Sequence, residues 1–299
     1  MIVRSAVANG SLPLQRAADF LALTKPRVVL MVLITTLVGF SLCAPGIANA
    51  SRLFQTLLGA ALAAGGTLAL NQVIERELDA RMERTRRRPL PAGRLRPAEA
   101  AVFGIGVTAA GLAVLALGVN PASGLTVAVI LVIYLFVYTP LKRRSSLCTL
   151  FGAVPGALPP VAGWLAAGGR LGPEPLNLFA LLFLWQLPHT LAIACVHRAD
   201  YARAGLCLPP VLDPEWHSTG AQVVVQSAAL LVAGLLPGLT GMAGLVYLLG
   251  AAGLGIGVLG YALGLAGSRS VADARRLMLA SLAYLPALFA LLALDRTAF

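Results

Sequence analysis

Nine long apolar stretches leave few folds open to this chain of 299 residues. They cover roughly residues 28–45, 53–74, 99–118, 122–141, 147–168, 176–196, 220–239, 242–265 and 276–294. Each has about 18–25 residues, enough for a helix to cross a hydrocarbon core of roughly 30 Å. Only 12% of the residues are charged, about half the share that is typical of soluble domains. The sequence predicts an all-α, polytopic membrane protein with about nine transmembrane helices around a central cavity.

The basic residues are distributed unevenly between the two ends of these stretches. If successive stretches cross a membrane in alternation, all 23 lysines and arginines except Arg52, Arg170 and Arg296 fall on one side. The positive-inside rule makes that side cytoplasmic, so we expect a cytoplasmic N-terminus and a C-terminus outside the cell membrane. The net charge of +11 therefore reports topology, and no nucleic-acid partner is expected. Residues 1–24 lack the features of a cleavable signal peptide and are predicted to be a cytoplasmic segment.

A polar cluster follows directly on the second apolar stretch. Asn71, Glu75 and Asp79 are spaced by four residues and would share one face of a continuous helix. Five arginines follow closely, namely Arg81, Arg84, Arg86, Arg87 and Arg88. Carboxylates supply the oxygen ligands that Mg²⁺ prefers, and guanidinium groups clamp phosphate oxygens. The cluster predicts a metal-bridged diphosphate at the cytoplasmic end of a membrane helix; the alternative is a loop whose arginines only set topology.

A second acidic position follows the sixth stretch, four spans after the first. Asp200 would face the first cluster across the central cavity if the chain folds as two halves. It has no carboxylate partner one turn away, because Val196 and Ala204 occupy those places. Asp200 is therefore predicted either to hold metal or diphosphate, or to pair with Arg198 or Arg203.

Seven segments, in this order and spacing, resemble the intramembrane aromatic prenyltransferase superfamily. They are Leu23–Val28, Asp79–Thr85 with Arg88–Leu90, Tyr138–Thr139 with Lys142–Arg144, Gly156–Trp164, Trp185–His189, Arg198–Tyr201 with Ala204–Gly205, and Ala274–Leu277 with Ser281, Tyr284 and Leu285. Together they are most similar to the haem O synthase branch of that superfamily. The chain departs from the branch pattern at Gln72, at Glu75, where Asp is usual, at Thr190, where Phe is usual, and over 207–210.

The resemblance implies that residues 25–299 form an intramembrane prenyltransferase domain. Its expected reaction is the Mg²⁺-dependent transfer of a farnesyl group from farnesyl diphosphate to the vinyl group of haem B, which forms haem O. The expected metal ligands and catalytic residues are Asn71, Glu75, Asp79 and Asp200. The expected diphosphate contacts are Arg84, Arg88, Lys25, Arg27, Lys142 and Arg143, of which the last four are also explained by topology alone.

Two residues are candidates for contact with haem. A neutral imidazole inside the bundle, that of His189, would ligate the iron or contact a propionate, and Tyr201 would hydrogen-bond beside Asp200. The alternative for His189 is an ordinary core residue. Besides the bilayer, a haem-processing enzyme or a terminal oxidase in assembly is an expected partner. Two other functions stay open: the same fold acting on another aromatic acceptor, and a non-catalytic transporter or assembly factor.

Overall fold

A computed structural model describes residues 12–44 and 49–297. Within these ranges nine helical segments are long and apolar enough to cross a membrane. They are α2 (Pro26–Cys43), α3 (Ala50–Ile74), α5 (Pro97–Ala113) with η2 (Val114–Val119), α6 (Pro121–Val132) with η3 (Ile133–Tyr138) and α7 (Thr139–Leu141), α8 (Cys148–Ala157) with α9 (Pro159–Ala166), α10 (Pro173–Val196), α13 (His217–Leu239), α14 (Leu245–Ser268) and α15 (Val271–Leu294). The predicted all-α membrane fold is confirmed.

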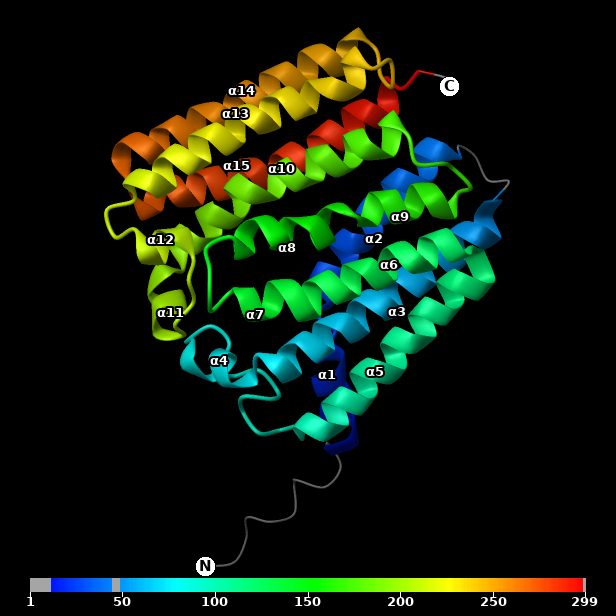
Figure 1. The fold of residues 1–299 in the computed structure, drawn as a ribbon, viewed down its shortest axis with the longest axis vertical. Helices are drawn as coiled ribbons and strands as arrows, with labels where there is room; N and C mark the ends of the chain where they lie inside the picture. The colour runs from blue at the N-terminus through cyan, green and yellow to red at the C-terminus, as the bar shows by residue number, and fades with distance from the viewer. Residues whose placement is uncertain (1–11, 45–48, 298–299) are drawn as a thin grey trace, which may run out of the picture.

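The helices lie side by side in one bundle (Figure 1). α13 and α14 form one edge and α3 and α5 the opposite edge, with α10, α15, α8, α9 and α2 between them. Large apolar side chains such as Val102, Leu117 and Leu249 are exposed on the outer helices. Such a surface suits lipid, because apolar side chains that contact hydrocarbon avoid the unfavourable contact with water.

One predicted span is interrupted. The fifth apolar stretch was expected to be continuous over 147–168, but α8 and α9 are separated at Leu158. Pro159 and Pro160 begin α9, and proline has no backbone N–H to continue the hydrogen-bond pattern of a preceding turn. The break places α9 against α2, where the two backbones nearly touch. A Cβ atom at Gly39 would lie 1.9 Å from Pro160 O, and one at Gly163 would lie 2.0 Å from Thr36 O.

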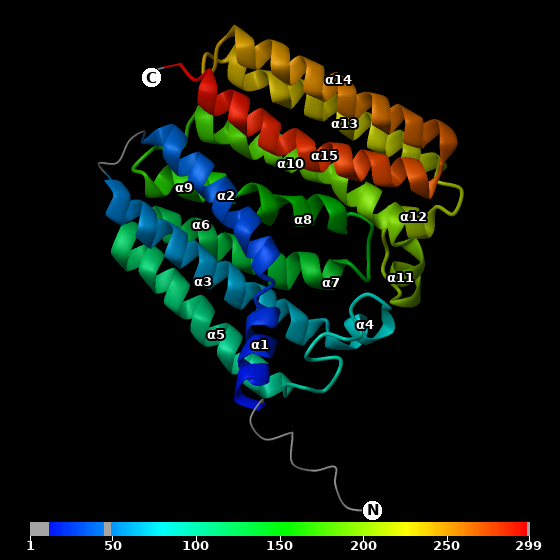
Figure 2. The same ribbon diagram turned by 180° about the vertical axis from the view of Figure 1, so that it is seen from behind.

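Four short helices lie outside the spans. They are α1 (Leu12–Leu23), α4 (Arg76–Arg81), α11 (Arg198–Arg203) and α12 (Pro209–Leu212). α4, α11 and α12 cluster at one end of the bundle in both views (Figures 1 and 2). An apolar cluster of Leu78, Met82, Ala204 and Leu206 packs α4 against the segment after α11. The two polar motifs, more than 100 residues apart in sequence, are therefore joined at the same end.

Candidate active site

The first motif does not lie on one continuous helix. α3 ends at Ile74, and Glu75 leaves the helical conformation with φ −93° and ψ 8° before α4 begins. The expectation that Asn71, Glu75 and Asp79 share one face of a single helix is therefore wrong in detail. The turn at Glu75 lets Leu78 and Met82 reach their apolar partners beyond α11, and this packing redirects the chain.

Asn71 is buried at the last turn of α3 and links three elements. Its Nδ2 donates to Thr139 Oγ1 at 3.1 Å, and Lys25 Nζ donates to its Oδ1 at 3.3 Å.

Lys25 has a left-handed backbone with φ 49° directly before Pro26. Proline disfavours the right-handed helical conformation in the residue before it. Burial, together with the nearby charges of Arg88 and Lys142, lowers the pKa of Lys25 to about 8.

Glu75 is paired with a lysine from the opposite side of the opening. Lys142 Nζ lies 2.8 Å from Glu75 Oε1, and the two side chains are 15% and 13% exposed. The same ammonium lies 4.4 Å from the centre of the Tyr138 ring. This lysine therefore connects Glu75 to the Tyr138 ring, and the attraction between a cation and a ring face stabilises its position.

Asp79 is paired with the arginine predicted to clamp phosphate. Arg88 Nη1 lies 2.9 and 2.8 Å from the two carboxylate oxygens, and Asp79 is only 2% exposed. Thr85 Oγ1 donates to the backbone carbonyl of Asp79 at 2.8 Å, which folds the loop back onto α4. Asp79 and Arg88 thus lie together beside Lys25 and Lys142.

Asp200 reaches the first motif through the backbone. Its Oδ1 accepts a hydrogen bond from the N–H of Glu83 at 3.1 Å, and it forms an ion pair with Arg203. Burial alone would raise the pKa of the Asp200 carboxyl, but the Glu83 hydrogen bond and the Arg203 charge lower it overall. The ion pair with Arg203 that one alternative predicts is present, and a role of Asp200 toward metal or diphosphate stays a prediction. The Asp200 carboxylate also links α11 to the loop after α4.

The other predicted contact residues lie around this end. Arg27, Arg84 and Arg143 are exposed, and Tyr201 packs against the apolar cluster between α4 and α11.

In the described part of the chain, no three His, Cys, Asp or Glu side chains are arranged to hold a metal ion. The donor chemistry nevertheless fits Mg²⁺, since Asn71, Glu75 and Asp79 present amide and carboxylate oxygens at one opening. Each of these three residues has at least one oxygen bound to a basic side chain.

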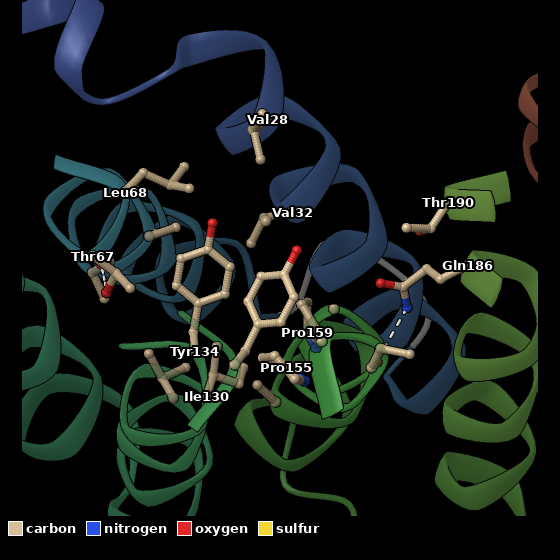
Figure 3. A pocket seen from close by; sticks show the side chains of 18 of the residues that line it. Val28, Val32, Thr67, Leu68, Ile130, Tyr134, Pro155, Pro159, Gln186 and Thr190 are labelled. Carbon is tan, nitrogen blue, oxygen red and sulfur yellow. Dashed lines mark hydrogen bonds between the residues drawn. The ribbon is translucent and has the colours of Figure 1, made fainter. Parts of the chain in front are cut away.

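An apolar cavity of about 300 Å³ lies between the helices beside this polar group, since Tyr138, whose ring contacts Lys142, is part of its lining. Its lining includes Val28, Val32 and Thr36 of α2, Ala60, Ala64 and Thr67 of α3, Val127 and Ile130 of α6, Tyr134 and Tyr138 of η3, and Gln186 and Thr190 of α10. Among the described residues that line it, the two tyrosines are the only aromatic ones, and their rings lie 5.4 Å apart. Figure 3 shows Tyr134 across the cavity from Gln186.

His189 lies on another face of α10. Its Nδ1 is 2.7 Å from Ser281 Oγ of α15, and its ring stacks on Trp185 with centroids 5.0 Å apart. It is not among the cavity-lining residues, whereas Gln186 and Thr190 are. This geometry favours the core alternative for His189, and its contact with haem stays a prediction.

Some residues of the site were assigned no role from sequence. Thr139 and Gln186 lie in segments that carry the family resemblance, but these two and Tyr134 also lie within apolar stretches, where a hydroxyl or amide is normally a satisfied structural group. Their spacing offers a weak signal: Tyr134 and Tyr138, like Gln186 and Thr190, are four residues apart. Only the packing of η3 against α8, and of α8 against α10, shows that both pairs face one cavity.

A bundle of membrane helices around an apolar cavity, with carboxylates and basic side chains at its opening, is suited to hold an amphiphile with an anionic head. The model of the UbiA prenyltransferase family matches residues 32–290, and the chain belongs to that family. It is 44% identical over 287 residues to the protoheme IX farnesyltransferase of Solibacter usitatus, covering 93% of this chain and 98% of that protein. It is 47% identical over 276 residues to the protein of the same name from an Anaeromyxobacter species, covering 92% and 93%.

Solved structures share the fold at low sequence identity. A digeranylgeranylglyceryl phosphate synthase structure aligns with a TM-score of 0.79 at 13% identity, over 94% of this chain and 98% of that one. A UbiA homologue from Archaeoglobus fulgidus, bound to GPP and Mg²⁺, aligns with a TM-score of 0.67 at 20% identity, over 92% and 99%. The fold is therefore that of intramembrane prenyltransferases.

Proposed function

We propose that this protein transfers the farnesyl group of farnesyl diphosphate to the vinyl group of haem B and so forms haem O. One observation carries the location of the reaction: Lys25, Lys142 and Arg88 meet Asn71, Glu75 and Asp79 at the opening of an apolar cavity. The diphosphate binds at this opening and the tail fills the cavity. The acceptor is proposed from the similarity to the protoheme IX farnesyltransferases.

The basic partners of the acidic residues explain how the opening accepts both metal and diphosphate. Asn71, Glu75 and Asp79, with Asp200 from α11, would hold Mg²⁺, which supplies charge neutralisation for the departing diphosphate. Lys25, Lys142 and Arg88, which bind oxygens of Asn71, Glu75 and Asp79, would supply positive charge to the phosphate oxygens at the same place. Arg27, Arg84 and Arg143 add positive charge at the rim, where they attract the anion.

The cavity governs the fate of the cation that forms when diphosphate leaves. The C–O bond of the substrate breaks and leaves an allylic cation, whose charge the faces of Tyr134 and Tyr138 stabilise electrostatically. The vinyl group attacks this cation, and the new positive charge lies on the vinyl carbon beside the pyrrole ring. An apolar lining keeps bulk water from the first cation.

The protein is further proposed to lie in the inner cell membrane with the active-site end on the cytoplasmic side, because that end carries most of the basic residues. A haem-processing enzyme or a terminal oxidase in assembly would then receive the product.

Expression in cells that lack haem O provides the test. Extracted pigments should contain a haem heavier than haem B by one farnesyl group and one hydroxyl group, and purified protein should form it only with Mg²⁺ and farnesyl diphosphate. A prenylated product other than haem would show the same fold acting on another acceptor. Absence of any prenylated product, with binding of diphosphate alone, would favour a transporter or an assembly factor.

A further inference from the structure

The wall of the cavity formed by α10 carries a polar pair that has no role in diphosphate binding or in ionisation of the substrate. Gln186 and Thr190 are one helical turn apart and both line the cavity. Gln186 Nε2 donates to the carbonyl oxygens of Leu182 at 3.0 Å and Ala153 at 3.3 Å. These two bonds fix the amide, and its oxygen points into the cavity (Figure 3).

The other threonines of the lining donate their hydroxyl groups to nearby backbone carbonyls, as Thr149 does to Ser146 O at 3.0 Å. Thr36 donates to Val32 O at 2.8 Å, and Thr67 donates to Ala63 O at 2.7 Å. By contrast, Thr190 Oγ1 and Gln186 Oε1 have no hydrogen-bond partner among the residues that the structure describes. A polar group that faces an apolar site is stabilised when a ligand supplies its missing hydrogen bond. The pair is therefore placed to bind a ligand that donates and accepts hydrogen bonds.

The chain also keeps space for the glutamine oxygen. A Cβ atom at Gly156 of α8 would lie only 1.9 Å from Gln186 Oε1. Any larger residue at position 156 would force this amide out of its place. Glycine here is thus explained by the close approach of a side chain from the facing helix.

The proposed reaction needs a small polar ligand at this place. After the vinyl group has formed its carbon–carbon bond, the cation beside the pyrrole ring has two outcomes. It loses a proton from the neighbouring carbon and becomes an alkene, or it gains a water oxygen and becomes an alcohol. The alcohol requires one water molecule held against the cation in an otherwise apolar cavity, and a buried water needs about two to four polar partners.

We propose that Gln186 Oε1 and Thr190 Oγ1 hold the water molecule that adds to this cation. Gln186 lies in a segment typical of the branch that the chain resembles, whereas the Thr190 hydroxyl is this chain's own, since Phe is usual at that position. The inference rests on the proposed function. Gln186 accepts one hydrogen of the water and Thr190 forms a second hydrogen bond to it, which leaves an oxygen lone pair facing the cation. The water oxygen forms the new C–O bond, and the proton that it releases passes to the departing diphosphate. Thr190 lies six residues before the end of α10, or roughly 9 Å at 1.5 Å per residue. The water is therefore held deeper between the helices than the diphosphate.

The test measures which product is formed. Thr190→Val keeps the shape of the side chain and removes the hydroxyl, and Gln186→Leu removes the acceptor oxygen. Each variant should still consume farnesyl diphosphate, while the ratio of alkene to alcohol in the extracted haem rises at least about tenfold by mass spectrometry. Thr190→Ser should restore the alcohol. Thr35→Val is the matched control, because Thr35 lies on α2 outside the lining and donates to Val32 O.

The outcomes separate this inference from the proposed function. If the wild type forms no prenylated haem, the proposed function fails. If the wild type forms the alcohol and Thr190→Val, folded and active, forms the alcohol alone, the water site is overturned. Loss of both products in Thr190→Val, with farnesyl diphosphate still bound, would assign the pair to haem binding and also overturn it. Because Thr190→Val is nearly isosteric, it decides the question even if Gln186→Leu does not fold.

Discussion

Arg88 closes the loop after α4 onto Asp79, with its Nη1 2.9 and 2.8 Å from the two carboxylate oxygens. Asp79 is only 2% exposed, whereas the Arg88 side chain is 28% exposed, so the carboxylate is the shielded member of the pair. The arginine proposed to bind diphosphate is thus held by a carboxylate proposed to bind Mg²⁺. Binding of both would require this pair to rearrange, and its two members should differ in their effects on stability and on transfer.

The Arg88→Ala substitution should lower both the stability of the protein and its prenyl-transfer activity. It leaves a buried carboxylate without its counter-ion, which costs about 3–5 kcal/mol of unfolding free energy. Loss of a charge-assisted contact to diphosphate, worth roughly 1.5–3 kcal/mol, should raise the required farnesyl diphosphate concentration by about tenfold or more. Thermal unfolding in detergent and transfer assays at varied substrate measure the two effects. Arg88→Lys should restore only part of the affinity, since an ammonium cannot form the planar fork. Full restoration would show that only the charge matters.

Asp79→Ala should abolish prenyl transfer, because it removes an expected ligand for Mg²⁺. The double variant Asp79→Ala with Arg88→Ala should be more stable than Arg88→Ala alone, because no unpaired carboxylate remains buried. It should nevertheless be inactive. Turnover of Asp79→Ala at the wild-type rate would contradict the metal assignment.

Glu75→Asp should retain most of the transfer activity. The substitution keeps the carboxylate that pairs with Lys142 at 2.8 Å and shortens it by one methylene. Glu75→Gln removes the charge and should raise the Mg²⁺ concentration needed for half-maximal rate. The measurement is a Mg²⁺ titration at saturating farnesyl diphosphate. Equal Mg²⁺ dependence of Glu75→Gln and the wild type would exclude Glu75 as a ligand.

Ala60→Leu should shorten the prenyl chain that the enzyme accepts. Ala60 lines the cavity eleven residues before Asn71, or roughly 16 Å from the opening at 1.5 Å per residue. Overfilling this end costs about 1–3 kcal/mol, so competition assays should show transfer of geranyl over farnesyl raised by about tenfold. Ala61→Leu, on the same helix outside the lining, is the control. Unchanged selectivity in Ala60→Leu would place the tail elsewhere.

His189→Ala separates contact with haem from a structural role. If the hydrogen bond to Ser281 is its main function, the variant should lose stability, and Ser281→Ala should lose a similar amount. Haem binding and its absorption spectrum should then be unchanged in the folded fraction. An altered spectrum in His189→Ala but not in Ser281→Ala would instead identify the imidazole as a haem contact.

The sequence by itself determined the membrane fold and the chemistry of the opening. Apolar runs of membrane-spanning length have few ways to satisfy their backbone in lipid other than as helices, and the charges of Asp79 and Arg88 are expensive within hydrocarbon and therefore mark its boundary. These are local properties, which periodicity and composition report directly.

Only the tertiary structure decided how these groups are combined. The pairing of Glu75 with Lys142, the turn at Glu75 and the cavity faced by Tyr134 and Gln186 depend on which helices pack together. His189 and Thr190 are neighbours in sequence, yet one faces Ser281 of α15 and the other the cavity. A helical step of about 100° per residue separates them, and the direction of each face is set by contacts between residues far apart in the chain.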